Sequence, residues 1–262
     1  MPPDMSSKPN SDDRRFGGIR RLYGEAAAQR IAAAHVCVVG IGGVGSWAAE
    51  ALARSGVGQL TLIDLDHVAE SNINRQVHAG DATLGQAKVL AMSTRIAGFA
   101  PQCRVTAVEA FVDADNPATL LPACDALIDA IDQVRAKAAL LAHCRRTGLA
   151  VVSTGAAGGR LDPTQIEVAD LARVTHDPLL ASVRTRLRRD HAFPREAKMD
   201  FGIECVFSRE PVRSPQDDAS QCEAPEVGPQ GLSCAGYGSA VTVTACFGLT
   251  AAAQALARIV AL

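Results

Sequence analysis

The 262-residue chain lacks three features that would each point to a particular chemistry or location. Its eight cysteines include no Cys-x-x-Cys pair, which argues against a structural zinc site. Its formal net charge is only −2, so RNA binding would have to come from local basic patches. Residues 1–14 are polar and contain no apolar segment of the kind found in signal peptides. We therefore expect a cytoplasmic protein with a disordered tail over residues 1–14.

One apolar run is long enough to be mistaken for a membrane segment. Residues 239–262 are mainly apolar, and their length alone would permit a membrane span. The run is rich in alanine, it is interrupted by Gln254 and Arg258, and no basic flank follows it. We therefore expect a buried helix and no membrane association. With 48% hydrophobic residues, the chain can form one large domain over residues 15–262.

The spacing of apolar residues predicts an α/β fold. Short apolar runs alternate with helical patterns, which is typical of a Rossmann-like, mostly parallel sheet covered by helices on both faces. Strands are expected near residues 36–40, 60–64, 103–108, 126–129 and 149–153. Helices are expected near residues 45–55, 85–98 and 133–147. Together these elements form a predicted nucleotide-binding half over residues 15–160.

The pattern changes after residue 160. Segments 166–171 and 201–207 have the alternation of antiparallel strands, which would extend the sheet. Residues 209–235 are rich in Pro, Gly, Ser and acidic residues, so we predict a long mobile loop before the C-terminal helix. A loop of that length inside a compact domain is more often functional than accidental.

The most informative stretch is a glycine-rich turn between a predicted strand and a predicted helix. Gly40, Gly42 and Gly45 have the G-x-G-x-x-G spacing, with Gly43 as an additional glycine. Glycine suits such a turn because phosphates must approach bare backbone N–H groups at a helix N-terminus. Asp64 follows the second strand, where a ribose hydroxyl would lie. The order of strand, turn, helix, strand and acid predicts a nucleotide site.

Polar residues downstream of Asp64 favour a triphosphate over a dinucleotide. Two cations and several amides close to a phosphate-binding turn suit a ligand whose charge must be neutralised as pyrophosphate leaves. One acid, Asp132, follows a predicted strand and could hold Mg²⁺ on the phosphates. The candidate nucleotide-binding residues after Asp64 are Asp66, Asn72, Arg75, Gln76, Lys88 and Asp132. Taken singly, the two cations could be ordinary surface residues, and Asp132 could simply cap the next helix.

As an ordered set, these motifs resemble the ThiF/MoeB/HesA superfamily of ubiquitin-activating-like adenylating enzymes. The shared motifs are Asp64-x-Asp66, Ser71 through Gln76, Gly85-Gln86-x-Lys88 and Asp129-x-x-Asp132. The flanking segments are similar to those of the bacterial branch of this superfamily that modifies threonylcarbamoyladenosine in tRNA. Those segments are Arg15-Phe-Gly-Gly18, Arg21-Leu-Tyr-Gly24, Gly155-Ala-Ala-Gly-Gly159 and Asp162-Pro-Thr-Gln165. Several superfamily members carry zinc on Cys-x-x-Cys pairs, and this chain departs from them there.

The resemblance implies an ATP-dependent dehydration of threonylcarbamoyladenosine next to the anticodon. The carboxylate of that nucleoside would be adenylated with loss of pyrophosphate, and ring closure would then expel AMP. In this scheme the glycine turn binds phosphates, Asp64 binds the ribose, Arg75 and Lys88 stabilise phosphate charge, and Asp132 holds Mg²⁺. The resemblance also implies a homodimer and leaves room for cysteine-desulfurase or sulfur-acceptor partners.

Two further candidate catalytic residues follow from the resemblance. Arginines before the first strand reach the partner subunit's ATP in the superfamily. Here Gly18 stands where many relatives have that arginine, and Arg21 is the candidate substitute. Cys234 lies in the predicted loop, where ubiquitin-activating enzymes have a thioester-forming cysteine. Intramolecular ring closure needs no thiol. Because the resemblance links some members of the family to sulfur-handling partners, a persulfide role for Cys234 stays open.

A cluster of arginines is the candidate contact for tRNA phosphates. Such a run is more often a solvated helix face than a binding site, and the resemblance is what favours RNA here. The cluster comprises Arg184, Arg186, Arg188 and Arg189.

Three functional classes compete on the sequence. The tRNA-modifying adenylating enzyme is preferred. An adenylyltransferase that activates the C-terminus of a ubiquitin-like sulfur-carrier protein shares every ATP-site residue, but the absent Cys-x-x-Cys pairs disfavour it. A nicotinamide-dependent oxidoreductase is disfavoured by the segment from Asn72 to Gln76 and by Lys88, because hydride transfer needs little beyond the ribose-binding acid.

Overall fold

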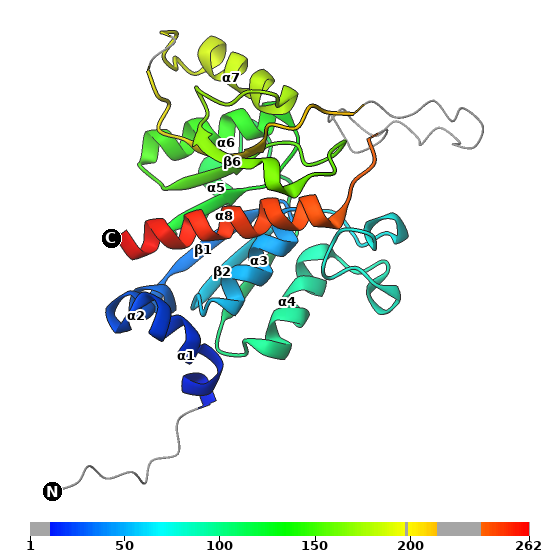
Figure 1. The fold of residues 1–262 in the computed structure, drawn as a ribbon, viewed down its shortest axis with the longest axis vertical. Coiled ribbons are helices and arrows are strands. Elements are labelled where there is room, and N and C mark those ends of the chain that lie inside the picture. Colours follow the sequence, from blue (N-terminus) through cyan, green and yellow to red (C-terminus); the bar gives the residue numbers. More distant parts are fainter. Residues whose placement is uncertain (1–10, 197–198, 214–236, 262) are drawn as a thin grey trace, which may run out of the picture.

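The computed structural model describes residues 11–196, 199–213 and 237–261. In this part of the chain, seven strands form one sheet in the order β3-β2-β1-β4-β5-β7-β6 (Figure 1). The strands are β1 His35–Val39, β2 Gln59–Ile63, β3 Arg104–Val108, β4 Ala126–Asp129, β5 Val151–Thr154, β6 Ile166–Asp170 and β7 Glu204–Ser208. All neighbours pair in parallel except β6 and β7. The predicted Rossmann-like fold, extended by an antiparallel pair, is confirmed.

The helices cover both faces of this sheet, as predicted. The α-helices are α1 Ser11–Tyr23, α2 Glu25–Ala33, α3 Gly45–Arg54, α4 Lys88–Phe99, α5 Pro117–Leu120, α6 Val134–Thr147, α7 Pro178–Asp190 and α8 Val241–Ala261. Short 3₁₀ helices are η1 Glu70–Asn72, η2 Asp81–Thr83 and η3 Pro163–Gln165. Alternate β1 residues enter different cores, since Val36 and Val38 pack with α3 and α8 whereas Cys37 and Val39 pack with α6.

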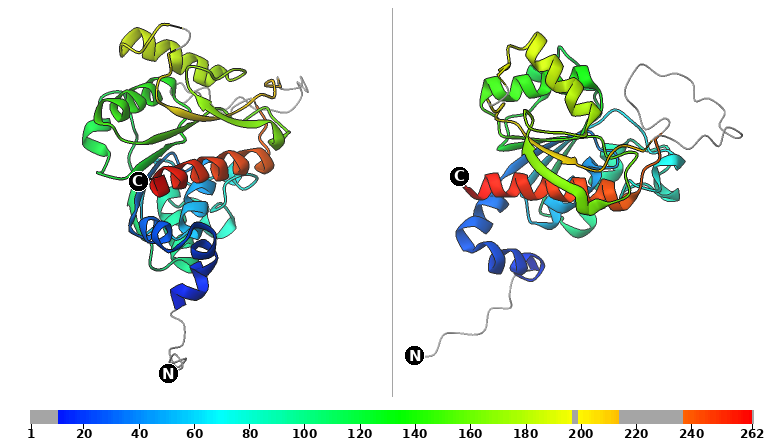
Figure 2. Two further views of the ribbon diagram at one scale, coloured as in Figure 1. Left: turned by 60° about the vertical axis from the view of Figure 1, so that its left-hand side comes forward. Right: turned by 45° about the horizontal axis from the view of Figure 1, so that its top comes forward.

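The N-terminal helix corrects one boundary. Residues 11–14 belong to α1, although we predicted a disordered tail up to residue 14. Phe16, Ile19 and Tyr23 recur at helical spacing on α1 and pack against the main core, which stabilises a helix where the preceding composition is polar. Residues 1–10 lie outside the described part of the chain. Figures 1 and 2 place α1 and α2 at the opposite end of the molecule from α7.

Helix α8 is a core helix. By length and composition it is the one helix in the described ranges that could cross a membrane. However, Val243, Phe247 and Ala251 are fully buried, and the helix lies beside α3 along the sheet (Figure 1). Gly248 makes the close approach possible, because a Cβ there would overlap the Val44 carbonyl oxygen and lie 2.9 Å from the Ala48 nitrogen.

Gly248→Ala is therefore expected to lower the free energy of unfolding by about 1–3 kcal/mol, since the new methyl group has no space between the two helices. Gly98→Ala is the matched control, because a Cβ at this helical glycine meets no atom within 4 Å. The control is expected to be neutral or slightly stabilising. Equal effects of the two substitutions in chemical denaturation would contradict this account of the α3–α8 contact.

Candidate functional site

A cavity of about 440 Å³ opens at the carboxyl ends of the parallel strands. This volume is in the range of sites that bind small molecules, and the edge where it lies is where open α/β sheets bind ligands. Most of the predicted nucleotide-binding residues line it. They are Gly40, Gly42, Gly43, Asp64, Asp66, Asn72, Arg75, Gln76, Lys88 and Asp132. The structure therefore gathers side chains that are separated by up to 92 residues in the sequence.

The glycine turn after β1 has the predicted shape, but its glycines differ in role. Gly40 has a φ of 87°, and a Cβ there would approach the Ala130 carbonyl oxygen to 2.8 Å. Gly45 does not line the cavity. A Cβ there would collide with the Gly40 carbonyl oxygen inside the turn. Its role is thus to let the turn close. A Cβ at Gly42 would meet no atom, so glycine at this position leaves room for a ligand.

Asp64 holds the turn against the end of β2. Its Oδ2 accepts the Ile41 N–H at 2.6 Å, and its Oδ1 accepts the Asp66 N–H at 2.8 Å. Burial raises the pKa of the Asp64 carboxyl, and Lys88 and the two N–H donors act in the opposite direction. The predicted ribose ligand is therefore also a structural brace of the phosphate-binding turn.

The two predicted cations are held differently. Lys88 is nearly buried, and its Nζ pairs with Asp66 Oδ2 at 2.7 Å, while the Asp66 side chain is 69% exposed. Arg75 is half-buried, and its Nη1 donates to the Ser71 carbonyl at 2.7 Å and to Asn74 Oδ1 at 2.9 Å. One compact ammonium and one planar guanidinium thus line the same cavity. Gln76 lines it too, and its buried Oε1 has no hydrogen-bond partner among the described residues.

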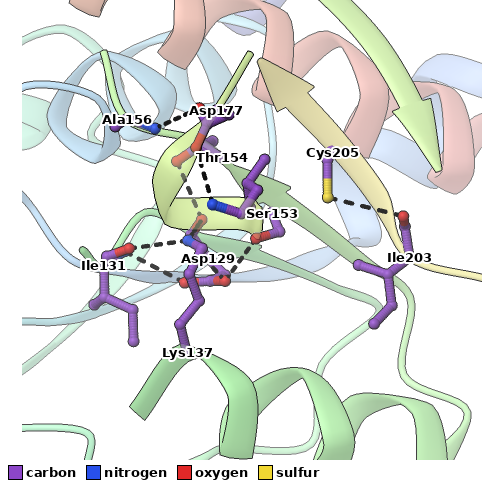
Figure 3. A network of polar contacts seen from close by, with 10 residues as sticks. Asp129, Ile131, Lys137, Ser153, Thr154, Ala156, Asp177, Ile203 and Cys205 are labelled. Carbon is purple, nitrogen blue, oxygen red and sulfur yellow. Dashed lines mark hydrogen bonds and ion pairs between the residues drawn. The ribbon is translucent and has the colours of Figure 1, made fainter. Parts of the chain in front are cut away.

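A buried ionic network underlies the wall that carries Asp132 (Figure 3). Asp129 and Lys137 are both fully buried, and Lys137 Nζ lies 3.0 Å from Asp129 Oδ2. Ser153 Oγ donates to the same carboxylate at 2.8 Å, and Lys137 also donates to the Ile131 carbonyl at 2.9 Å. Burial raises the pKa of Asp129, and Lys137 opposes that shift. The network fixes the backbone immediately before Asp132, which itself is exposed to the cavity.

A second buried ion pair shapes the neighbouring wall, after β5 (Figure 3). The segment after β5, residues 155–158, lines the cavity. Asp177 caps α7 through the Leu180 N–H, and its Oδ2 accepts the Ala156 N–H at 3.0 Å. Arg160, also fully buried, pairs with Asp177 at 3.4 Å and donates to the Ala156 and His176 carbonyls. Gly155 is required here, because any Cβ would strike the Asp177 carboxylate.

The sequence did not reveal the partners in these two networks. Asp129 and Gly155 belong to sequence motifs, whereas Lys137, Ser153, Arg160 and Asp177 lie outside them. A signal was present for Lys137, because Leu140, Leu141 and Cys144, which share its face of the helix, are all apolar. A lone charge on an apolar helical face is seldom fully buried unless it is paired, so it suggests a partner on the sheet.

Other predicted site residues lie away from the cavity or outside the described residues. Arg21 lies in α1 and does not line the cavity of its own chain, so its predicted reach toward a partner subunit stays a prediction. Cys234 and most of the predicted loop fall within residues 214–236, which are outside the described part of the chain.

The four arginines on α7 form more internal contacts than a solvated binding face would. Arg184 donates to the Leu171 and Val174 carbonyls, and Arg188 donates to Pro194 and stacks on Phe201. Arg186 and Arg189 share Asp190. Arg189 is the most exposed of the four, so an RNA contact is better served by Arg186 and Arg189 than by the two that tie α7 to the fold.

His78 is buried, and neither of its ring nitrogens has a hydrogen-bond partner among the described residues. Burial, together with Lys88 and Arg95, lowers its pKa from 6.5 to about 4. The pKa of His78 is lower in the folded state than in the unfolded state, so protonation of the imidazole favours unfolding. The free energy of unfolding is therefore highest above pH 6.5 and decreases as the pH falls toward 4.

His78→Leu is therefore expected to flatten the acid side of the stability profile. Between about pH 7.5 and about pH 4.5, the wild-type protein should lose roughly 2–3 kcal/mol more than the variant. Urea unfolding at the two pH values measures the difference. Parallel pH profiles for the two proteins would show that His78 is not the titrating group.

Comparison with known proteins agrees with the predicted resemblance. The chain matches the ThiF family over residues 17–262. It is 51% identical over 252 residues to a tRNA threonylcarbamoyladenosine dehydratase of Escherichia coli, and the match covers 95% of this chain and 94% of that protein. It is 44% identical over 249 residues to the protein of the same name in Haemophilus influenzae, with 94% of each chain covered.

A solved structure gives the same result in three dimensions. The crystal structure of the E. coli tRNA N6-threonylcarbamoyladenosine dehydratase in complex with ATP matches with a TM-score of 0.86 and 46% identity. The match covers 97% of this chain and 98% of that one. The similarity thus spans the nucleotide-binding half and the extension alike, and it is not confined to the motifs around the glycine turn.

Proposed function

The chain belongs to the ThiF family, and we propose that it uses ATP to dehydrate threonylcarbamoyladenosine in tRNA. It is an ATP-dependent enzyme of tRNA modification that closes the threonylcarbamoyl side chain into a ring. The observation that carries the proposal is the convergence of the glycine turn, Lys88, Arg75 and Asp132 on one cavity. Each of these residues suits a polyphosphate, and none is needed to transfer a hydride.

The chain's own residues fit ATP. The open space at Gly42 and the uncapped N-terminus of α3 leave backbone N–H groups available to phosphate oxygens. Lys88 and Arg75 supply positive charge beside that turn, where charge grows as the bond to pyrophosphate breaks. Asp64 accepts from a ribose hydroxyl with oxygen lone pairs that its two backbone donors leave free. Gln76 contributes a buried amide oxygen that still lacks a donor.

Mg²⁺ belongs to the proposal as the ion that accompanies the triphosphate. Asp132 is an exposed carboxylate on the cavity wall, and carboxylates together with phosphate oxygens are the ligands that Mg²⁺ prefers. The described residues contain no cluster of three His, Cys, Asp or Glu side chains that could hold a metal by itself. A metal at Asp132 would therefore depend on the nucleotide for most of its ligands.

The carboxylate of the nucleoside is activated and then consumed within the same substrate. Its oxygen attacks the α-phosphate, pyrophosphate leaves, and an atom of the modification then attacks the activated carbonyl and expels AMP. The net change is loss of one water from the nucleoside, with ATP cleaved to AMP and pyrophosphate. The chain's task is to align the carboxylate with the phosphate and to exclude water.

Other parts of the proposal extend beyond the cavity. The chain acts as a cytoplasmic homodimer in which Arg21 reaches the partner's nucleotide. Arg186 and Arg189 contact tRNA phosphates, with Arg184 and Arg188 in support. A cysteine desulfurase or sulfur acceptor is a candidate partner through Cys234. Removing the thiol with Cys234→Ser is expected to leave ring closure intact, because that step is intramolecular.

ATP–pyrophosphate exchange, measured with and without modified tRNA, tests the proposal. Exchange that depends on the tRNA, together with a mass loss of one water from the nucleoside, is the expected result. Exchange that ignores tRNA and requires a carrier protein with a C-terminal glycine would favour the sulfur-carrier adenylyltransferase. Absence of ATP–pyrophosphate exchange under all of these conditions would contradict the proposal.

A further inference from the structure

Exposed aromatic side chains are rare in this protein and lie at one place. The chain has seven phenylalanines, two tyrosines and one tryptophan, all within the described ranges. Of these, only Phe111 and Tyr237 are exposed, at 46% and 41%. Both line the cavity that contains the glycine turn. Two exposed rings in one cavity are a feature that binding explains and packing does not.

The sheet order separates the two rings. The glycine turn follows β1 at the centre, Phe111 follows β3 on the side of β2 and Asp64, and the 155–158 segment follows β5 on the other side. In a sheet of this kind, the acid after β2 marks the nucleoside end of the nucleotide. Tyr237 belongs to the opposite end, since a Cβ at Gly158 would lie only 3.6 Å from the Tyr237 Cβ.

Tyr237 is held in place by its neighbours. The Gly238 carbonyl accepts the Gly159 N–H at 2.8 Å, and the Ser239 carbonyl accepts Asn74 Nδ2 at 3.0 Å. One of these bonds ties the segment to the β5 wall, and the other ties it to the segment that carries Arg75. They hold the backbone next to Tyr237 on the β5 side of the cavity, away from Asp64.

We propose that Tyr237 stacks on the purine of the modified adenosine in tRNA. This contact would direct the threonylcarbamoyl group of the nucleoside toward the phosphates of ATP. This inference rests on the proposed function. Proteins that act on unpaired bases recognise them by stacking on aromatic side chains, and the base of an anticodon-loop nucleoside can be splayed out in this way. Tyr237 is 41% exposed and lines the cavity, so its ring is accessible to a base that enters there.

Kinetics of Tyr237→Ala with modified tRNA test the assignment. Loss of one stacked base is expected to raise KM for the tRNA by about 5- to 150-fold and to leave KM for ATP unchanged. Tyr237→Phe keeps the ring and is expected to behave like the wild-type enzyme. Leu249→Ala is the matched control, since Leu249 is an exposed apolar residue that does not line the cavity, and it should leave KM for the tRNA unchanged.

The outcomes separate this inference from the proposed function. A wild-type enzyme that dehydrates the nucleoside, with an unchanged tRNA KM for Tyr237→Ala, would overturn the inference alone. An equal loss for Tyr237→Phe and Tyr237→Ala would overturn stacking in favour of the hydroxyl group. A wild-type enzyme with no dehydration activity would overturn both. Measured ATP affinity of Tyr237→Ala equal to wild type shows that the variant is folded.

Discussion

Lys88→Met is expected to lower ATP–pyrophosphate exchange by about 100- to 1000-fold, the usual loss when one fixed charge or donor at a reacting centre is removed. Lys88 lines the cavity at the start of α4, where its ammonium is nearly buried. Nearby low-polarity surroundings strengthen its attraction to phosphate relative to a lysine in water. The substitution also leaves Asp66 facing the cavity without its partner, and that negative charge would repel the triphosphate.

The fold should survive this change. Asp66 is 69% exposed, so its carboxylate can be hydrated once Lys88 is gone. Arg209→Met is the matched control, because Arg209, just after β7, forms an exposed ion pair with Glu167 of the edge strand β6 and does not line the cavity. The control should keep exchange within a factor of about two, as expected for a surface pair. Exchange by Lys88→Met within threefold of wild type, roughly, would remove Lys88 from the mechanism.

Lys137→Met is expected to destabilise the protein by about 3–5 kcal/mol, because it leaves the Asp129 carboxylate buried without its cation. Both side chains are fully buried, so water cannot replace the lost partner. The pKa of Asp129 is already raised by burial, and loss of Lys137 raises it further. The deficit relative to wild type should therefore grow as the pH rises and shrink in acid, where the carboxyl is neutral.

A second variant distinguishes loss of the pair from loss of packing. Asp129→Asn combined with Lys137→Met removes both charges and keeps an amide that can still accept from Ser153. The double variant should recover more than half of the lost stability, as measured by urea unfolding. A double variant as unstable as Lys137→Met alone would mean that the charge on Asp129 is not the cause.

The fold was largely predictable because its strands are nearly continuous apolar runs. Segments 60–64 and 126–129 were expected as strands, and β2 and β4 are found there to within one residue. The N-terminal boundary was wrong because α1 is stabilised by packing of Phe16 and Ile19 on the core, which local polarity does not report. Helix α8 was expected to be a buried helix although its length would permit a membrane span, and its packing against α3 confirms this.

The motifs of the candidate site could be predicted from the sequence, but the ion pairs that hold the site in place could not. Lys88 and Asp132 belong to short motifs whose chemistry can be inferred from the sequence alone. The pairing of Lys88 with Asp66, and of Arg160 with Asp177, links residues 22 and 17 positions apart. The α7 arginines show the reverse case, since a charged run that suggests RNA is partly used to hold the helix in place.

By itself, the sequence determined the order of strands and helices, the phosphate-binding turn and the family, because local composition and short spacings encode backbone conformation and ligand chemistry. Only the tertiary structure decided which charges are buried together, why Gly45 must be glycine, and that Phe111 and Tyr237 face one cavity from two sides. These features depend on distances between segments far apart in the chain, and such distances arise only when the sheet and its helices pack.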